Sequence, residues 1–517
     1  MAQRGYYLFC YVRIRAVTRW IVVWLLDTPR RPATYTHRYR HLVDSRIFAV
    51  PSQYDIRIDR RHSMINSLPL YDGDCFVQVN DDVAAKLDGF ELRLLASRVV
   101  AIRDNQFFDL QNLIAGGGAI TRNDNPYDLR RQNLAVLYYD LSRHGELELR
   151  ESDADGARLA VLTPKVTVAA SSSPIQAVRL SPSDRLAFLP FEETRNVPNI
   201  AADAIHNIAT QLTLSHWPAN RTPARYKANL STESVLRFVP DMSEYPDVRH
   251  VTTDHFDLDG LASVYALIAP EHAQSHGQLL VDVARFGDFS CGHSTKARRL
   301  AFALNTITEQ ALHAAGTVPN ESVRITALFR TLLPALRDLL DASVIRDALW
   351  RDAEQHHMET EALLDSPNVT IEQYPEIDLA VFRLPTSHVP YVRVPQRYFG
   401  FSPIAFHNRT PLSTIALVTQ DDVVVHQRYE GWVELHSAAP RPRRDLSILA
   451  RALQSAETED CRWHYDGVQH IMPRLGRDGA PLSSLSVETI VCELKRFLAI
   501  APAAWSPSVG CAKVVGG

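Results

Sequence analysis

The stretch RHVTTDHFDLDGLASVYAL, residues 249–267, decides the fold, because a strand-like run, an acidic cluster and a helix-like run follow one another in it. The run 249–253 is typical of a short buried strand, and Leu261, Val264 and Tyr265 share one face of the helix expected after it. If that strand belongs to a parallel sheet, the residues between strand and helix lie at its carboxyl end, where open α/β sheets build their sites.

The acidic cluster has the composition of a metal site. His255, Asp257 and Asp259 alternate along extended chain and can point to the same side. One imidazole and two carboxylates suit manganese, magnesium or iron. Gly260 lets the chain turn closely into the helix, whose positive end favours a phosphate. The alternative is that Asp259 only caps the helix while its neighbours are solvated.

Strands alternate with helices around this stretch, which predicts right-handed crossovers and an α/β fold with a mainly parallel, doubly wound sheet over 186–366. The expected strands include PNIAADAI, QLTLSHW and QLLVDVA (278–284), and a helical segment is expected over 295–365. The return to strands afterwards predicts a smaller C-terminal α+β domain at 367–505.

The N-terminal part has a different character. Residues 1–65 are rich in arginine without a clear period, which predicts a basic, poorly patterned arm; Met64 offers an alternative start. Short strand-like runs separated by turn residues predict a separate strand-rich domain at 66–170, with a glycine turn at 114–120. The Ser/Pro-rich segment 171–185 is typical of a linker.

Composition bounds the function. A chain of 517 residues predicts two or three domains, and a net charge of −4 gives no overall basic field for nucleic acid. The six cysteines have no CxxC spacing, so reduced thiols and a cytoplasmic location are expected. The apolar run 20–26 is far shorter than the roughly 20 residues that span a bilayer, so no membrane partner is expected.

The motif HFDLDG followed by a helix resembles the first motif of the DHH phosphoesterase superfamily, which includes RecJ-type nucleases and oligoribonucleases. The resemblance implies that the aspartates bind two manganese ions (or magnesium), with His255, Asp257 and Asp259 as ligands. The second motif of that superfamily is an aspartate at the end of a neighbouring strand. Asp282 and Asp288 are the candidates here, and Asp288, beside Gly287, is preferred.

Two motifs of that superfamily are missing. The Asp-His-His triplet is absent, its nearest string being EQHH at 354–357, and the glycine-rich GGGH segment of the substrate-binding domain is absent too. Residues 186–500 also resemble an uncharacterised bacterial family known only as a domain of unknown function, which implies no activity.

Other residues are candidates for supporting roles. His216 and Asn220, in LSHWPANRTP, follow another predicted strand; His216 is a candidate proton carrier or replacement ligand, or a core histidine, and Asn220 a candidate substrate contact. The candidate substrate-binding residues of the C-terminal domain are Arg441, Arg443, Arg444 and His464, since arginine forks grip phosphates and the aromatic neighbours of His464 can stack on bases. A solvated basic turn and a packed strand are the alternative.

One further pair has metal-capable spacing. His272 and His276 lie four residues apart on one helical face, but no carboxylate of clear direction stands near them in the sequence, so they are interpreted as surface residues.

Two hypotheses follow. In the first, a metal-dependent phosphoesterase acts on a phosphodiester, a nucleotide, an oligonucleotide or another small phosphorylated substrate, with His255 or His216 positioning the nucleophile or carrying a proton. In the second, a catalytically degenerate relative keeps the fold as a ligand-binding or scaffold protein. A homodimer is compatible with either hypothesis.

Overall fold

The structure is a computed structural model. It describes residues 5–14, 17–26, 66–70, 76–96, 98–103, 106–122, 127–141, 145–151, 159, 162, 175–316, 321–385, 400–439, 441–478 and 481–507. The chain divides into two compact units, Met1–Ile65 and Asn66–Gly517.

The first unit contains an antiparallel hairpin. Strand β1 (Gly5–Ile14) pairs along its whole length with β2 (Val17–Leu26). The prediction of a basic, poorly patterned arm did not include these two strands, in whose sequences aromatic and β-branched residues favour extended chain. The rest of the predicted arm lies outside the described residues.

The second unit contains a four-stranded parallel sheet. Its strands are β11 (Ala187–Phe188), β12 (Asn199–Ala202), β13 (Thr210–Leu214) and β14 (His250–Thr252). They lie in the order β11-β14-β12-β13, and every pair is parallel. The carboxyl ends of β12, β13 and β14 therefore meet at one edge. The prediction of an α/β fold with a parallel sheet is confirmed at this level.

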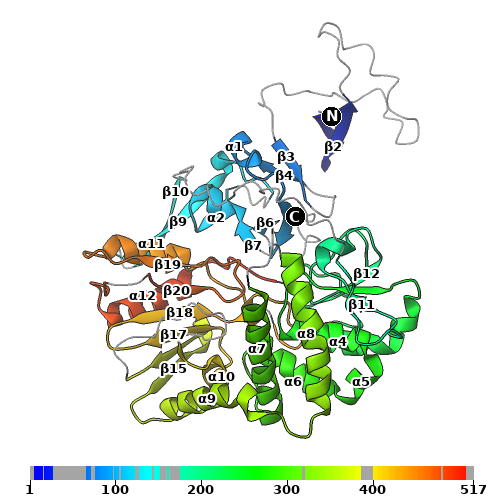
Figure 1. The fold of residues 1–517 in the computed structure, drawn as a ribbon. Coiled ribbons are helices and arrows are strands. Elements are labelled where there is room, and N and C mark those ends of the chain that lie inside the picture. The colour runs from blue at the N-terminus through cyan, green and yellow to red at the C-terminus, as the bar shows by residue number, and fades with distance from the viewer. Residues whose placement is uncertain are drawn as a thin grey trace. The chain divides into compact units, whose positions relative to one another are not determined.

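Seven helices follow or connect these strands: α3 (Ser231–Phe238), α4 (Leu258–Ile268), α5 (Pro270–Ser275), α6 (Gly277–Asp288), α7 (Thr295–Ala315), α8 (Glu321–Asp341) and α9 (Arg351–Leu364). All eleven residues of α4 are buried, because this helix packs against the sheet and also against α3, α6 and α8. Helices α6, α7 and α8 pack one against the next (Figure 1). The predicted helical segment at 295–365 is confirmed.

The predicted strand at 278–284 is wrong, since these residues belong to helix α6. The run is short and apolar, and such a run fits a buried strand or a buried helix equally well. Packing decides for the helix: Leu280, Val283 and Ala284 are buried while Asp282 on the opposite side is half-exposed. A Cβ on Gly287 would lie 2.7 Å from the Cβ of Leu258, so this glycine allows α6 to approach α4.

The C-terminal part has a mixed six-stranded sheet, as the α+β prediction implies. Its strands are β15 (Thr370–Tyr374), β16 (Leu379–Arg383), β17 (Thr414–Val418), β18 (Val423–Gln427), β19 (Trp463–Tyr465) and β20 (Arg474–Arg477). Their order is β15-β16-β17-β18-β20-β19, and β16 with β17 is the one parallel pair of this sheet. The helices of this part are α10 (Pro403–His407), α11 (Ser447–Ala456) and α12 (Val487–Ile500).

The beginning of the second unit is rich in strands, as expected. It contains β3 (Asn66–Pro69), β4 (Phe76–Val79), α1 (Asp81–Ala84), β5 (Glu91–Leu95), β6 (Arg98–Arg103), β7 (Gln106–Asp109), α2 (Leu110–Ala115), β8 (Ala119–Thr121), β9 (Leu134–Asp140) and β10 (Glu146–Glu151). The predicted glycine turn is confirmed: Gly116, Gly117 and Gly118 have positive φ between α2 and β8, and Arg451 donates to two of their carbonyls. One hydrophobic core runs from Leu95 to Trp505, so this region and the later ones share a core; the domain boundaries inside the second unit stay predictions.

Candidate metal centre

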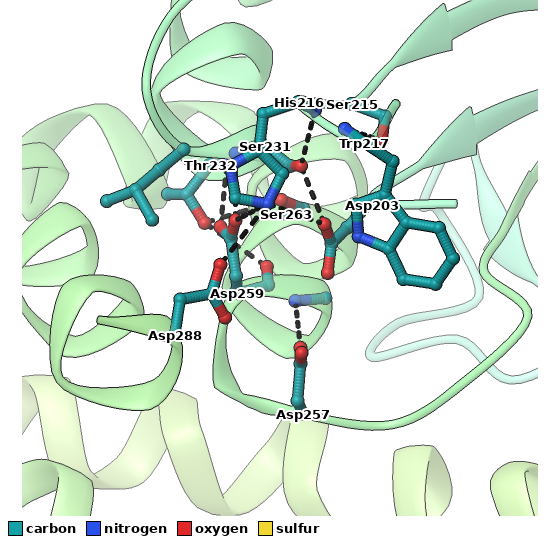
Figure 2. A network of polar contacts seen from close by, with 12 residues as sticks. Asp203, Ser215, His216, Trp217, Ser231, Thr232, Asp257, Asp259, Ser263 and Asp288 are labelled. Carbon is teal, nitrogen blue, oxygen red and sulfur yellow. Dashed lines mark hydrogen bonds and ion pairs between the residues drawn. The ribbon is translucent and has the colours of Figure 1, made fainter. Parts of the chain in front are cut away.

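Three adjacent parallel strands each end in polar residues at the same edge of the sheet. Asp203 follows β12 directly, His216 follows β13 by two residues, and His255 follows β14 by three. The parallel pairing of β12 with both neighbours brings these ends together. Figure 2 shows Asp203 and His216 pointing toward Asp259, which comes from the first turn of α4, and toward Asp288, the last residue of α6.

His216 lies at the centre of this group. Its Nδ1 donates to the carbonyl oxygen of Asn229 at 2.5 Å, which leaves the lone pair of Nε2 on the other side of the ring. That Nε2 lies 3.7 Å from Asp203 Oδ1, 3.8 Å from Asp259 Oδ2 and 3.3 Å from Asp288 Oδ2. Metal-binding histidines are oriented in this way, with the second nitrogen held by a carbonyl.

The carboxylates are fixed by the start of α3. The backbone N–H groups of Ser231 and Thr232 donate to the two oxygens of Asp259 at 2.8 and 2.7 Å. The hydroxyl of Ser231 donates to Asp203 Oδ1 at 2.7 Å. These contacts use the positive end of the helix to hold two buried anions in place.

A second group shares Asp203. His255 Nε2 lies 3.0 Å from Asp257 Oδ2 and 3.4 Å from Asp203 Oδ2. Its Nδ1 lies 2.8 Å from Asp254 Oδ1, so Asp254 orients the ring. Asp257 is the N-cap of α4, and its Oδ1 accepts from the N–H of Gly260 at 2.8 Å. A Cβ on Gly260 would lie 3.2 Å from that oxygen and 3.4 Å from Asp203 Oδ2, so glycine keeps both carboxylates close.

Burial makes this arrangement electrostatically costly. Asp203 is 1% exposed, His216 1% and Asp259 0%. Burial and the repulsion of neighbouring carboxylates raise the pKa of Asp259 and of Asp288 well above the usual range. Burial alone would lower the pKa of His255, but the charge of Asp257 and hydrogen bonds to surrounding carboxylates raise it well above its ordinary value. For Asp257, burial opposes ionisation, yet the neighbouring His255 lowers its pKa.

Among the described residues, two buried carboxylate oxygens have no hydrogen bond, and both belong to this centre. These are Asp203 Oδ2 and Asp288 Oδ2, which face histidine nitrogens at 3.4 and 3.3 Å without hydrogen-bond geometry. Buried carboxylate oxygens without a donor are costly unless a cation compensates them.

The donor atoms fit divalent cations. Within each of two groups, Asp203–His216–Asp259 and Asp203–His255–Asp257, one ligand atom per residue lies within 4.8 Å of the others. Imidazole nitrogens combined with carboxylate oxygens suit manganese and magnesium. The groups share Asp203, whose carboxylate has one oxygen for each group and could contact two neighbouring ions.

The structure thus brings together five of the predicted site residues: His216, His255, Asp257, Asp259 and Asp288. Asp288 does so from a helix end, because the strand expected before it is α6. Asp282 lies six residues before Asp288 on that helix and accepts a hydrogen bond from Gln278 at 2.9 Å. Asp282 is in neither of the two groups.

The sequence interpretation missed Asp203. An aspartate at the exit of the apolar run NIAA was the available signal, because a predicted parallel strand places its next residue at the carboxyl edge. Tyr429, from the C-terminal part, was missed too. Its hydroxyl lies 3.3 Å from His216 Nε2, and burial together with the surrounding aspartates raises its pKa well above the usual range.

The predicted substrate-binding residues have other contacts. Asn220 donates to Trp217 O at 2.8 Å and to Glu434 Oε2 at 2.9 Å, and so ties the loop after β13 to the C-terminal part. Arg443 is 3% exposed and donates to the carbonyls of Arg428 and His470, both at 2.6 Å.

Three more of these residues remain near the surface. Arg444 donates to Pro442 O at 3.3 Å, His464 pairs with Asp466 at 3.2 Å, and Arg441 lies 3.4 Å from Asp378. No contact with the two groups is recorded for them among the described residues, and their substrate role stays a prediction.

Fold and site together define an α/β protein with buried aspartates and histidines at the carboxyl edge of a parallel sheet. The chain belongs to a family of unknown function (DUF6687), whose model matches residues 184–509. No curated protein and no solved structure matches the chain. Among the described residues, no helix combines the length and apolar character that crossing a membrane requires.

Proposed function

We propose that this protein is a metal-dependent phosphoesterase that binds two divalent ions, Mn²⁺ or Mg²⁺, at the two groups joined by Asp203. One observation carries the proposal: the carboxylate of Asp203 is shared between two sets of converging donors, and its Oδ2 is buried without a hydrogen bond. Asp288, whose Oδ2 lies 3.3 Å from His216 Nε2, supplies a further ligand to the first group.

The ions, when bound, supply charge neutralisation, an activated water and stabilisation of charge on a phosphoryl group. The protein's own residues prepare for this. The carbonyl of Asn229 holds His216 in the tautomer that presents Nε2, and the first turn of α3 holds Asp259. Asp254 keeps a proton on Nδ1 of His255, so the Nε2 of that ring can bind a cation or carry a proton.

The outer side of the centre is the part that a substrate can reach. The side chain of Asp257 is 35% exposed, against 10% for His255, so the second group is the one nearer to solvent. A small pocket beside it is lined by Arg93, Ala204 and Trp217 among others. The ring of Trp217 lies 4.9 Å from that of His255. We propose a phosphodiester, a nucleotide or another small phosphorylated compound as the substrate.

A second candidate is a metal-binding protein without catalysis. It is favoured by the burial of the first group, where the side chains of His216 and Asp259 are both 0% exposed. It is also favoured by the missing Asp-His-His triplet.

The test compares activity on bis(p-nitrophenyl) phosphate with and without Mn²⁺. The wild type is expected to require Mn²⁺, and the double variant Asp257→Asn, Asp259→Asn to lose the activity. Asp288→Asn is expected to lower it strongly, while Asp282→Asn, on the same helix, is the matched control that keeps it. Mn²⁺ binding without hydrolysis would favour the second candidate, and absence of Mn²⁺ binding would rule out both.

We also propose two finer features. The first is a doubly wound sheet with helices on both faces, supported by the sheet order β11-β14-β12-β13, which departs from chain order as doubly wound sheets do. A cytoplasmic location is supported by the described cysteines Cys291, Cys461 and Cys492, which are free thiols. Cell fractionation would test it.

A further inference from the structure

A second cluster of metal-binding side chains lies outside the centre described above. Helix α5 ends at Ser275, and His276 follows as its C-cap, so the rings of His272 and His276 stack one turn apart with centroids 4.6 Å from each other. Asp341, the last residue of α8, brings its Oδ1 to 2.9 Å from His272 Nε2. The structure thereby supplies the carboxylate that the sequence alone does not place.

The Nδ1 atoms of both histidines already have partners. His272 Nδ1 lies 2.6 Å from the hydroxyl of Tyr265, a fully buried residue of α4. His276 Nδ1 donates to the carbonyl oxygen of His272 at 3.1 Å. Nε2 is therefore the atom of each ring that faces the third residue of the cluster; in His272 it is hydrogen-bonded to Asp341 Oδ1, which an ion would replace as its partner, and buried or backbone groups orient both rings from behind.

The three ligand atoms of this surface group, one each from His272, His276 and Asp341, lie within 4.8 Å of one another. Asp341 is at the carboxyl end of α8, where the helix dipole is negative and a carboxylate is unfavourable without a cation. Its side chain is 59% exposed, against 19% for His272, so an ion can enter from solvent. Arg337 and Asp338, one turn earlier on α8, are the other charged groups that act on this corner.

We propose that His272, His276 and Asp341 bind a zinc ion that links α5 to the end of α8. Two imidazoles and one carboxylate are a common zinc ligand set, and water completes the tetrahedron. The ion joins segments about 65 residues apart in sequence (276 and 341) and stabilises the corner where α4 turns into α5. This site is independent of the proposed phosphoesterase centre.

The first test uses the full chain, freed of metal by a chelator, and follows carbethoxylation of individual histidines by diethyl pyrocarbonate with peptide mass spectrometry. In the wild type, Zn²⁺ is expected to protect His272 and His276 at least tenfold. Asp341→Asn is expected to lose that protection, whereas Asp338→Asn, an exposed carboxylate one turn earlier, keeps it. Equal modification with and without Zn²⁺ in the wild type would overturn the proposal, and so would unchanged protection in Asp341→Asn.

The second test counts the zinc equivalents bound by titration calorimetry. The double variant His272→Gln, His276→Gln is expected to bind one equivalent fewer than the wild type. His313→Gln, an exposed histidine of α7, is the control that binds as many as the wild type. Because zinc can also enter the interior centre, only the difference between variants is interpreted. An unchanged number in the double variant contradicts the proposal, and circular dichroism of the metal-free variants confirms that they fold.

Discussion

The interior centre and the surface group use the same kinds of side chain, but they differ in burial. The interior carboxylate Asp259 is 0% exposed and held by two backbone N–H groups, whereas the side chain of Asp341 in the surface group is 59% exposed. Water can solvate Asp341 when no ion is present. Water does not reach Asp259, so under the proposal a bound cation contributes more to the electrostatic balance of the interior centre than to that of the surface group.

The largest expected effect is that of Asp203→Asn on hydrolysis. Asp203 is common to both interior groups, so the substitution removes a carboxylate ligand from each of them. Activity on bis(p-nitrophenyl) phosphate in Mn²⁺ is expected to fall on the order of a thousandfold or more. Asp282→Asn is the control. Activity within threefold of the wild type in Asp203→Asn would contradict the shared role.

The next effect concerns stability and pH in the metal-free protein. Burial and neighbouring carboxylates raise the pKa of Asp288, so its ionisation destabilises the fold as the pH rises from about 4 through the raised pKa. His255, whose pKa is also raised, stabilises the fold below its unfolded pKa near 6.5, and this contribution is lost as the pH rises through the folded value. The melting temperature is therefore expected to fall between pH 5 and pH 8.

Asp288→Asn is expected to reduce the decrease in melting temperature between pH 5 and pH 8. It is also expected to raise the melting temperature of the metal-free protein at pH 8 by several degrees, since about 1 kcal/mol of stability corresponds to roughly 2–4 °C in a larger domain. Mn²⁺ is expected to stabilise the wild type more than this variant. Thermal denaturation at both pH values, with and without Mn²⁺, measures both effects. A lower metal-free melting temperature for Asp288→Asn would mean that this carboxylate stabilises the fold.

Some parts of the interior centre could be predicted from the sequence and others could not. The acidic cluster before α4 was predictable, because strand, Asp, Gly and helix follow in order over 249–267. Asp203 was not identified, since a single aspartate after an apolar run has no spacing pattern of its own. Helix α6 was mistaken for a strand because a short apolar run has no decisive period. Asp288 still reached the centre, since packing against α4 carries the end of α6 to it.

The residues of the surface group could be predicted from the sequence only in part. The spacing of His272 and His276 was visible, but Asp341 lies on α8, and only tertiary packing brings it to them. The fold class was predictable because alternation of strands and helices is a local property. The contacts that complete each metal group are not.

A smaller effect is expected for Gly260→Ala. The added Cβ meets Asp257 Oδ1 at 3.2 Å, which is tighter than an ordinary contact, and Asp203 Oδ2 at 3.4 Å, so it shifts the carboxylate of Asp257 slightly without removing any ligand. The affinity for Mn²⁺ is expected to fall about tenfold. Gly277→Ala is the matched control, since its Cβ would meet its nearest atom, Leu236 Cδ1, at 3.7 Å. Equal Mn²⁺ affinities for Gly260→Ala and Gly277→Ala would contradict the claim that close packing at Gly260 matters for the centre.

The smallest effect is expected for the surface group. The double variant His272→Gln, His276→Gln is expected to keep Mn²⁺-dependent hydrolysis within twofold of the wild type, because neither side chain is part of the interior centre. Steady-state kinetics at saturating Mn²⁺ checks this. A tenfold loss would show that the two groups are coupled.

The most direct test of the central claim is the number of Mn²⁺ ions bound per chain, measured by equilibrium dialysis in the His272→Gln, His276→Gln background. We predict that the His272→Gln, His276→Gln variant binds two equivalents of Mn²⁺. When Asp203→Asn is added to it, the affinity for both ions is expected to fall strongly. Two equivalents with unchanged affinity after that substitution, or no bound Mn²⁺ before it, would contradict a centre built around a shared Asp203.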